Sequence, residues 1–381
     1  MDLNLTPEQA AFQQAARRFA HDVVAPVAAA IDERDEFPID VVRQAGALGF
    51  MGVTVAKEWG GAGLDYVSYA VALEEIARAS ATLAVILVVS NSLVVEPLAR
   101  FGTDDQKQRW LRSLATGQSI GAFALSEENA GTDAANQQTT VEASPGGGFR
   151  LNGRKTWVTC AAVADLVMMF AGEASAAGKR PVSAFLVPAD TPGVVRGPRD
   201  QSMGVRGLGA LDLDLKDVDV PAGAMLGVRG AGFEIARWAF EGARIAIAAQ
   251  AIGIGQVAFD EARAHAKRRH TFGKPIASYE AIQFMLADSA TDLDAARVLT
   301  LKAAVTKDEQ ERCGVEAAMA KLYASEAATR VTDRAMQILA SAGYRRGSTL
   351  ERLYRDVRAA EMYPGTSEVQ RMLISGAVLR K

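Results

Sequence analysis

Cysteine and histidine are scarce in this sequence, which limits the chemistry that it can carry. Among 381 residues there are two cysteines, Cys160 and Cys313, and three histidines, His21, His265 and His270. Two cysteines do not make a disulfide framework, so we expect a reducing compartment and a cytoplasmic protein. No histidine has zinc-ligand spacing with another histidine or a cysteine, and we therefore predict no metal site.

The sequence also lacks two common catalytic signatures and a large net charge of either sign. The sequence contains no GxSxG elbow and no GxxxxGK[ST] phosphate loop, which argues against a serine hydrolase and a P-loop nucleotidase. The 42 basic and 45 acidic residues nearly balance, with a net charge of −3. This balance gives no reason to expect nucleic acid or an anionic membrane as a partner.

No uninterrupted hydrophobic run is long enough to span a bilayer. The most apolar run, ATLAVILVV at residues 81–89, is too short to span a bilayer and is followed by Ser90 and Asn91. We interpret it as a buried core helix and predict no membrane insertion. The N-terminal stretch MDLNLTPEQ begins acidic and turns amphipathic, which is not the pattern of a signal peptide.

What the sequence does contain is a change of hydrophobic period along the chain. The first block has helical spacing, and it opens with a capping-box pattern in which Thr6 precedes Pro7 and Gln9. The last block is helical again. Its long segment 233–269 is apolar almost all round, as in a helix that is buried inside a bundle.

The middle block has the shorter period of strands. The leucines of LDLDL at 211–215 alternate with aspartates, and prolines punctuate the block. The segment FRLNGRKTWVT at 149–159 indicates a hairpin with its turn at Asn152-Gly153. The sequence therefore predicts an α+β fold with an N-terminal helical domain (1–120), a middle β domain (121–230) and a C-terminal helical bundle (231–381).

Four polar clusters are candidate sites, and each also has an ordinary structural interpretation. FALSEENAGTD at 123–133 offers hydroxyls and backbone N–H groups to an anionic ligand, or else a helix cap at Thr132 or Asp133. KTWVT at 155–159 places Trp157 and Thr159 on one strand face, beside a ligand or in the core. RRHTFGKPI at 268–276 can hold a phosphate or end a helix. The small residues of QILASAGY at 337–344 allow a flat ligand or another backbone to approach closely.

The clusters belong to an ordered set of seven segments: LSEENAGTD, KTWVT, MGVRG, RRHTFGKPI, QILASAGY, ERLYRD and GTSEVQR. In order and spacing this set resembles the acyl-CoA dehydrogenase family of flavoproteins, and the resemblance covers essentially the whole chain. It implies an N-terminal helical domain, a middle β domain and a C-terminal four-helix bundle. It also implies FAD as cofactor, a homotetramer or homodimer, and an acyl-CoA or acyl-carrier thioester as substrate. It identifies neither the acyl group nor the electron acceptor.

The resemblance also assigns roles to residues. The cofactor-binding residues that it implies are Phe123, Leu125, Ser126, Gly131, Thr132, Trp157, Thr159, Arg269, Thr271, Phe272, Gln337, Ser341, Thr366 and Glu368. The substrate-binding residues are Glu241, Arg244 and Gly365. The segment that runs from Arg269 through His270 to Phe272 is expected to reach the cofactor of a neighbouring subunit.

The sequence departs from the family at the catalytic base. The family most often has a glutamate at the position of Pro364, where it removes the α-proton of the substrate. Some members place that glutamate at the position of Ala243 instead. Proline also lacks the backbone N–H with which the family holds the thioester oxygen. Glu241 is acidic, but it lies roughly 200° around the helix from Ala243, so no catalytic residue is assigned.

Three functions stay open at this stage. The first is FAD-dependent α,β-desaturation of an acyl thioester with hydride transfer to the flavin. It requires an unassigned base or a substrate whose α-proton needs less help. The second is elimination of a leaving group from an acyl-CoA, as in desulfination. The third is a non-catalytic protein that binds acyl-CoA or flavin.

Overall fold

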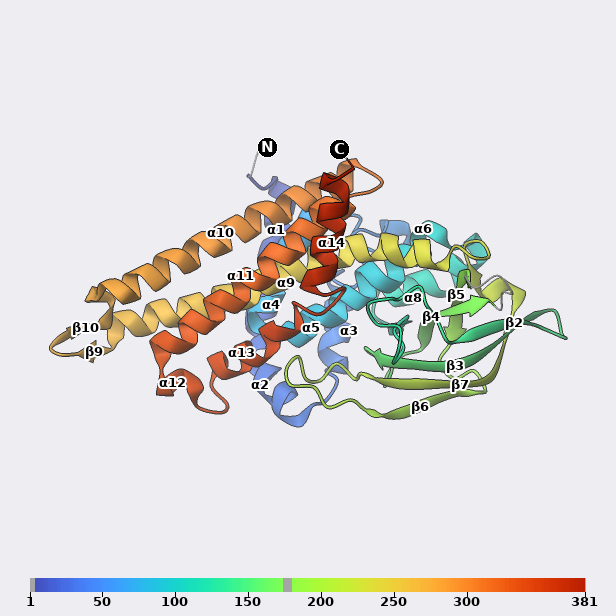
Figure 1. Cartoon of the computed structure of the whole chain (residues 1–381), viewed down its shortest axis with the longest axis horizontal. Coiled ribbons are helices and arrows are strands. Elements are labelled where there is room, and N and C mark those ends of the chain that lie inside the picture. The colour runs from blue at the N-terminus through green and yellow to red at the C-terminus, as the bar shows by residue number, and fades with distance from the viewer. Residues whose placement is uncertain (1–3, 174–179, 381) are drawn as a thin grey trace.

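The computed structural model describes residues 4–173 and 180–380 (Figure 1). Helices come first along the chain, strands follow, and helices return, which confirms the α+β fold class expected from the sequence. Figure 1 shows the β sheet at one end of the molecule and a group of long helices that extends to the other end.

The first helices form a compact layer with a buried centre. They are α1 (Pro7–Phe19), η1 (Ala20–Val24), α2 (Ala25–Arg34), α3 (Ile39–Ala47), η2 (Lys57–Trp59), α4 (Tyr66–Ala79), α5 (Ala81–Val88), η3 (Val89–Val95), α6 (Glu96–Phe101), α7 (Asp104–Gln106), η4 (Lys107–Leu111) and α8 (Arg112–Ala115). Helix α1 begins at the predicted capping box, because Thr6 Oγ1 accepts the N–H of Gln9 and Gln9 Oε1 accepts the N–H of Thr6. All residues of α5 are buried, which confirms the core-helix interpretation of residues 81–89.

Two helical stretches have the length and composition to cross a membrane, Ala81–Phe101 and Gly232–Arg268. In these stretches 94% and 83% of the apolar window, respectively, lies buried inside the protein. Core helices of a folded domain have the same apolar character, because they too are surrounded by hydrophobic side chains.

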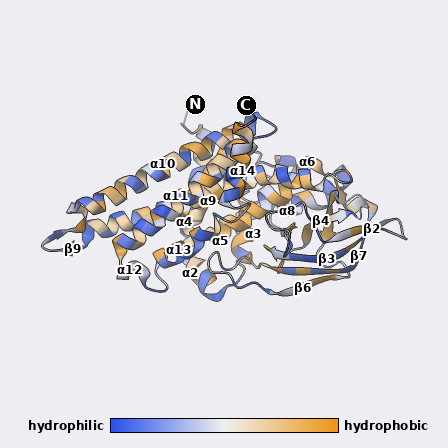
Figure 2. Cartoon of the chain, in the orientation of Figure 1, coloured by the Kyte–Doolittle hydropathy of each residue, from blue (hydrophilic) through white to orange (hydrophobic). Residues whose placement is uncertain are grey.

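The strands form an eight-stranded sheet in the order β6-β7-β3-β2-β4-β5-β8, with β1 paired in parallel to β4. They are β1 (Gly121–Ala124), β2 (Thr140–Ser144), β3 (Gly148–Val158), β4 (Leu166–Glu173), β5 (Val182–Pro188), β6 (Val194–Arg199), β7 (Leu211–Pro221) and β8 (Met225–Leu226), with η5 (Ala222–Ala224) between the last two. Along β7, buried leucines alternate with more exposed polar residues as predicted. Figure 2 shows hydrophobic and hydrophilic residues mixed over the strands of the sheet.

The predicted turn at Asn152-Gly153 is wrong. Strand β3 passes straight through these residues, and the hairpin turn lies between β2 and β3, where Ser144 pairs with Gly148. The Asn152 side chain instead bonds across the sheet to Asp217, and Gly153 marks a bulge in the pairing with β7. The turn chemistry of the dipeptide is therefore overridden by cross-strand contacts.

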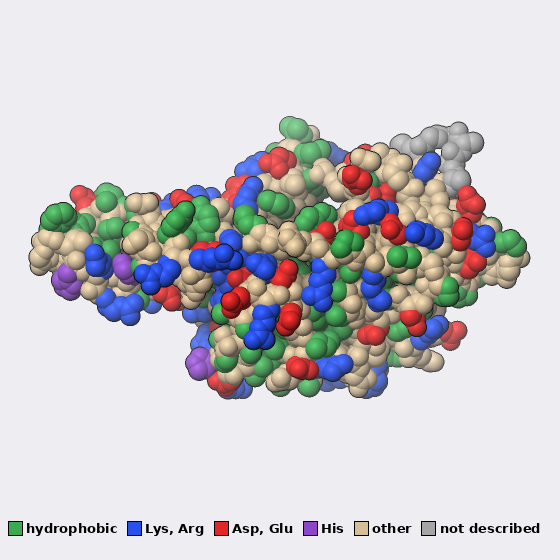
Figure 3. All heavy atoms as spheres, turned by 90° about the horizontal axis from the view of Figure 1, so that it is seen from below, with side chains coloured by type: hydrophobic (Ala, Val, Ile, Leu, Met, Phe, Trp, Pro, Cys, Tyr) green, Lys and Arg blue, Asp and Glu red, His purple; other side chains and the backbone are tan. Residues whose placement is uncertain are grey.

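The last part of the chain is dominated by three long helices. Its elements are α9 (Gly232–Arg268), β9 (His270–Thr271), β10 (Lys274–Pro275), η6 (Ile276–Ser278), α10 (Glu280–Glu309), α11 (Gly314–Leu339), α12 (Ser341–Tyr344), α13 (Thr349–Ala359) and α14 (Ser367–Val378). Helix α9 packs against α4, α10, α11 and strand β5, so it joins all parts of the chain. The far ends of α9 and α10, with the β9–β10 hairpin, project as an arm that carries basic and histidine side chains (Figure 3).

Candidate functional site

A cavity of about 1100 Å³ lies between the β sheet and the helices of the last part of the chain. The β side contributes the end of β1, the loop after it and the end of β3. The helical side contributes α9, the start of α11, the loop 363–366 and α14. Eleven of the residues that the sequence predicted line this cavity: Phe123, Leu125, Ser126, Gly131, Thr132, Trp157, Thr159, Glu241, Arg244, Gly365 and Thr366.

The β side of the cavity presents an aromatic surface and several hydroxyls. Trp157 is 59% exposed and has a positive φ of 55°, and its backbone N–H donates to Asp212 Oδ1 at 3.2 Å. Strand β3 ends at Val158, so Thr159 lies beyond it. The prediction that Trp157 and Thr159 share a strand face is therefore wrong, although both line the same cavity. An exposed indole beside hydroxyls suits a flat, polar-edged ligand.

The loop after β1 is held by a buried ion pair that sequence reasoning missed. Lys155 Nζ donates to Glu127 Oε1 at 2.6 Å and to the carbonyl of Leu125 at 3.3 Å. Glu127 Oε1 also accepts the N–H of Thr139 at 3.1 Å. Burial lowers the pKa of Lys155 to about 8, against the opposing attraction of Glu127. No helix begins within residues 123–139, so the loop is positioned by this ion pair and not by a helix cap.

The helical side of the cavity is built around the carbonyls of the loop 363–366. Arg244 Nε lies 3.4 Å from the carbonyl oxygen of Pro364, and Lys321 Nζ donates to the carbonyl of Gly365 at 2.9 Å. Gln370 Nε2 donates to the same Gly365 carbonyl at 2.9 Å. Gly365 has a φ of +87°, which a glycine adopts without strain. Thr366 caps α14, so a new helix begins directly after Pro364 and Gly365.

Arg244 and Lys321 are buried cations without a carboxylate partner in the part of the chain that the structure describes. Arg244 is 8% exposed and Lys321 is fully buried, and their hydrogen-bond partners are carbonyl oxygens. Burial lowers the pKa of Arg244 to about 10 and that of Lys321 to about 8. A buried charge is normally paired, but here Glu241 attracts Arg244 and Glu361 attracts Lys321 only from beyond ion-pair distance.

The carboxylate of Glu241 is already engaged. Arg312 Nε donates to Glu241 Oε1 at 2.7 Å, and the N–H of Cys313 donates to Oε2 at 3.0 Å. Lys307 Nζ lies 3.7 Å from the same Oε2, and Glu241 is only 2% exposed. Ala243 is fully buried and is not among the residues that line the cavity. Neither residue presents a free carboxylate to the loop 363–366.

The remaining predicted residues do not reach this cavity within one chain. Arg269, Thr271 and Phe272 lie on the projecting arm, and Phe272 is 96% exposed. Gln337 and Ser341 lie at the junction of α11 and α12. Glu368 lies in the first turn of α14 without lining the cavity. Their role in cofactor binding stays a prediction.

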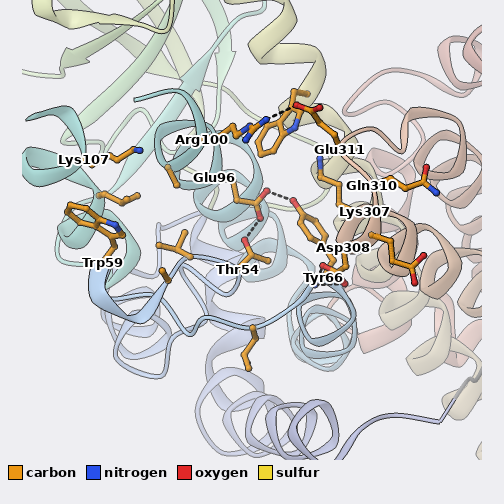
Figure 4. Close-up of a pocket in the computed structure, with 17 residues that line it drawn as sticks. Thr54, Trp59, Tyr66, Glu96, Arg100, Lys107, Lys307, Asp308, Gln310 and Glu311 are labelled. Carbon is orange, nitrogen blue, oxygen red and sulfur yellow. Dashed lines mark hydrogen bonds and ion pairs between the residues drawn. The ribbon is translucent and has the colours of Figure 1, made fainter. Parts of the chain in front are cut away.

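A second cavity of about 790 Å³ lies between the first helices and the α10–α11 junction (Figure 4). Glu96 points toward Tyr66 and Thr54 there and accepts hydrogen bonds from both hydroxyls, the one from Thr54 at 2.8 Å. Lys307 Nζ lies 4.1 Å from the centre of the Trp238 ring. None of the predicted site residues lines this second cavity, so the first cavity is the candidate active site.

Comparison with known proteins identifies three matching family models. They are the N-terminal, middle and C-terminal domains of acyl-CoA dehydrogenase, over residues 6–118, 122–218 and 230–379. The mitochondrial short-chain specific acyl-CoA dehydrogenase of Bos taurus is 44% identical over 97% of this chain and 89% of its own length. The structure of butyryl-CoA dehydrogenase from Megasphaera elsdenii has a TM-score of 0.97 and 38% identity over 100% of both chains. A structure of PigA with FAD and proline has a TM-score of 0.95 and 27% identity, again over 100% of both chains.

Proposed function

Because this chain belongs to the acyl-CoA dehydrogenase family, with FAD as its cofactor, we propose that it desaturates an acyl thioester between the α- and β-carbons. The observation that carries this proposal is the cavity itself, which is lined by an exposed indole, several hydroxyls and the buried cation Arg244, while Lys321 holds the loop 363–366 from outside the cavity. When bound, FAD accepts a hydride from the substrate.

The residues of the cavity fit this cofactor. Trp157, Ser126 and Thr159 would hold the flavin ring, and Gly131 and Thr132 would approach the pyrophosphate or the substrate. No heavy atom outside the neighbouring residues lies within 4 Å of a Cβ built on Gly131, so the loop leaves room for a ligand. The Glu127–Lys155 ion pair keeps this loop in place. The acyl chain would enter the part of the cavity that the loop 363–366 lines.

The thioester end of the substrate meets a strongly basic lining. Besides Arg244, three arginines line the cavity, Arg237, Arg312 and Arg380, together with two glutamates, Glu241 and Glu316. Arginine binds phosphate through paired N–H donors, which suits the anionic CoA part of an acyl-CoA. Gly365 contributes backbone to the same space.

The adenosine end of the cofactor requires a second copy of the chain. Residues 269–272 and 337–341 lie away from the cavity, and Phe272 is almost fully exposed. An exposed phenylalanine on a projecting arm is typical of a subunit contact. We infer that the protein is a homo-oligomer, a tetramer or a dimer, in which these residues and Glu368 meet the partner's FAD. We also infer a cytoplasmic location from the scarcity of cysteine.

Flavin content and flavin reduction test the proposal. The purified protein should carry one FAD per chain, and Trp157→Ala should weaken FAD binding about 10-fold through the loss of aromatic stacking. Trp59→Ala is the matched control, because Trp59 lines the second cavity. A protein that gains no flavin in excess FAD contradicts the proposal.

A second candidate is elimination of a leaving group from an acyl-CoA, because Pro364 supplies no carboxylate to remove the α-proton. Anaerobic titration with a panel of acyl-CoAs separates the possibilities. Bleaching of the flavin absorbance marks desaturation, product without bleaching marks elimination, and a spectral shift without product marks a non-catalytic binder.

A further inference from the structure

The unpaired cations beside the loop 363–366 point to the chemistry of the substrate. We propose that the acyl thioester carries a carboxylate on its α-carbon, that Arg244 binds this carboxylate, and that its loss as CO2 creates the α-carbanion without a protein base. This inference rests on the proposed function and specifies its substrate class.

The first argument is the charge of the site. Arg244 is buried on α9, lines the cavity, and forms no ion pair within the described residues. Lys321, fully buried beneath the same loop, adds a second positive charge. An uncompensated buried cation is unfavourable, and a guanidinium pairs best with a carboxylate through two parallel hydrogen bonds. A carboxylate on the substrate provides the ion-pair partner that Arg244 does not find among the described residues.

The second argument is that no described carboxylate in the cavity is free beside residue 364. Glu241 is held by Arg312 and the N–H of Cys313. Glu316 lies in the first turn of α11. Glu316 precedes Lys321 by five residues, so the two lie roughly 7.5 Å apart along the helix axis. Lys321 is the residue that donates to the carbonyl of Gly365. General base catalysis requires a carboxylate within hydrogen-bond reach of the proton that is removed, and within the described residues no hydrogen bond joins either glutamate to the loop 363–366.

The hydroxyls of the site do not replace the missing base. Tyr363 precedes Pro364, but its hydroxyl faces Gln250 at 3.4 Å, and burial raises its pKa well above the ordinary value. Ser126, Thr159 and Thr366 carry alcohols, which are too weakly basic to remove an α-proton unaided. A substrate that forms its own carbanion removes the need for any of these groups.

The reaction balances with the chemistry that the family supplies. The bond between the α-carbon and the carboxylate breaks, CO2 leaves, and the electron pair remains on the α-carbon as a thioester enolate. A hydride then leaves the β-carbon for the oxidised flavin, and an α,β-unsaturated thioester forms. The negative charge of the carboxylate ends on the reduced flavin. The negative charge stays close to Arg244 when it moves from the carboxylate onto the enolate, so Arg244 attracts the charge in both states.

The test compares two substrates that differ only at the α-carbon. Butyryl-CoA and 2-ethylmalonyl-CoA, which is butyryl-CoA with an α-carboxylate, are mixed anaerobically with the holoenzyme. Flavin absorbance is followed by stopped flow, and isotope-labelled CO2 is counted. We expect 2-ethylmalonyl-CoA to bleach the flavin at least about 100-fold faster than butyryl-CoA, with one CO2 released for each flavin reduced.

The other outcomes are distinct. Rapid bleaching by butyryl-CoA without preference for the α-carboxylate leaves the proposed function standing and overturns this inference. Bleaching by 2-ethylmalonyl-CoA without release of CO2 also overturns it. Release of CO2 without bleaching supports carbanion formation and overturns desaturation. If neither thioester reacts, the inference is wrong for short acyl chains, and the wider acyl-CoA panel decides the proposed function.

Binding measurements test the role of Arg244 independently of turnover. Arg244→Gln should raise the dissociation constant of 2-ethylmalonyl-CoA by at least about 30-fold and that of butyryl-CoA much less, as measured by calorimetry. Arg237→Gln is the matched control, because Arg237 lines the same cavity but pairs with Glu234 at 2.8 Å. If both variants lose the same affinity for both thioesters, Arg244 does not bind the α-carboxylate. Arg244→Lys, which keeps the charge, should restore part of the selectivity and covers the case in which the glutamine variant does not fold.

Discussion

Replacement of Pro364 by glutamate is the most informative single change in this protein. The variant would add a carboxylate beside Arg244, whose Nε lies 3.4 Å from the residue 364 carbonyl. It would also restore a backbone N–H that proline lacks. A positioned general base is worth about 10²–10⁴ in rate, and one oxyanion donor about 10²–10³. These effects need not add, so we expect butyryl-CoA to reduce the flavin at least about 100-fold faster in Pro364→Glu than in the parent.

The stability cost of this change should be small. Loss of a proline removes about 0.4–1 kcal/mol through the unfolded chain, against a total stability of roughly 5–15 kcal/mol. The new carboxylate gains a buried cationic partner, which offsets part of that loss. Gly365 keeps its positive φ, and Lys321 and Gln370 still hold its carbonyl, so the loop should keep its shape.

Stopped-flow reduction of the flavin under anaerobic conditions is the assay. Pro364→Gln is the matched control, because it restores the N–H without a carboxylate and so isolates the contribution of the base. Ala243→Glu should give less than Pro364→Glu, because it leaves the N–H missing and adds a carboxylate at a fully buried position. With 2-ethylmalonyl-CoA, Pro364→Glu should be slower than the parent, because two carboxylates would compete for Arg244. If the parent already reduces its flavin rapidly with butyryl-CoA and Pro364→Glu adds nothing, a base is present that this reasoning has missed.

Four further outcomes are expected. Lys155→Met should weaken FAD binding and increase proteolysis of the loop 125–138, because Glu127 would be left as an unpaired buried charge, whereas the exposed Lys274 should tolerate the same change. Burial lowers the pKa of Lys321 from 10.5 to about 8. As the pH rises, the folded protein therefore loses this proton at a lower pH than the unfolded chain does. The free energy of unfolding from urea titrations should therefore rise between about pH 8 and 10.5 in the parent relative to Lys321→Met, and parallel profiles would contradict this. Phe272→Asp should shift light scattering toward smaller species and lower the flavin content, and an unchanged assembly with full flavin would show that this arm is not a subunit contact. Glu241→Gln should destabilise the α10–α11 junction by about 1–3 kcal/mol, measured as a lower midpoint of thermal unfolding, because it weakens the contacts with Arg312 and Lys307.

Local patterns in the sequence were sufficient to predict several helices and strands. The capping box at Thr6 was readable because both of its hydrogen bonds join residues three apart. The alternation in β7 and the apolar character of α5 and α9 were readable because burial of one face or of a whole helix fixes the residue types directly. The ordered motifs also led to the family and to FAD, which the comparisons confirm.

Other features depended on contacts between distant segments. Asn152-Gly153 has the composition of a hairpin turn, but its strand is held by Asp217, which lies 65 residues away. The Glu127–Lys155 pair joins two motifs that were identified separately, and nothing in either motif states that they meet. Lys321 sits in an alanine-rich run whose apolar neighbours indicate a buried face, yet its partner is the carbonyl of Gly365, 44 residues away.

The sequence by itself determined that residue 364 is a proline, and therefore that this position has neither a carboxylate nor a backbone N–H. Only the tertiary structure decided what surrounds that proline. It brings Arg244 from α9 and Lys321 from α11 to the same loop, and it engages Glu241 with Arg312 and Cys313. The physical reason is that charge balance in a buried site is a property of all the side chains that meet there. The distance between these residues along the chain does not show whether their side chains lie together in the folded protein.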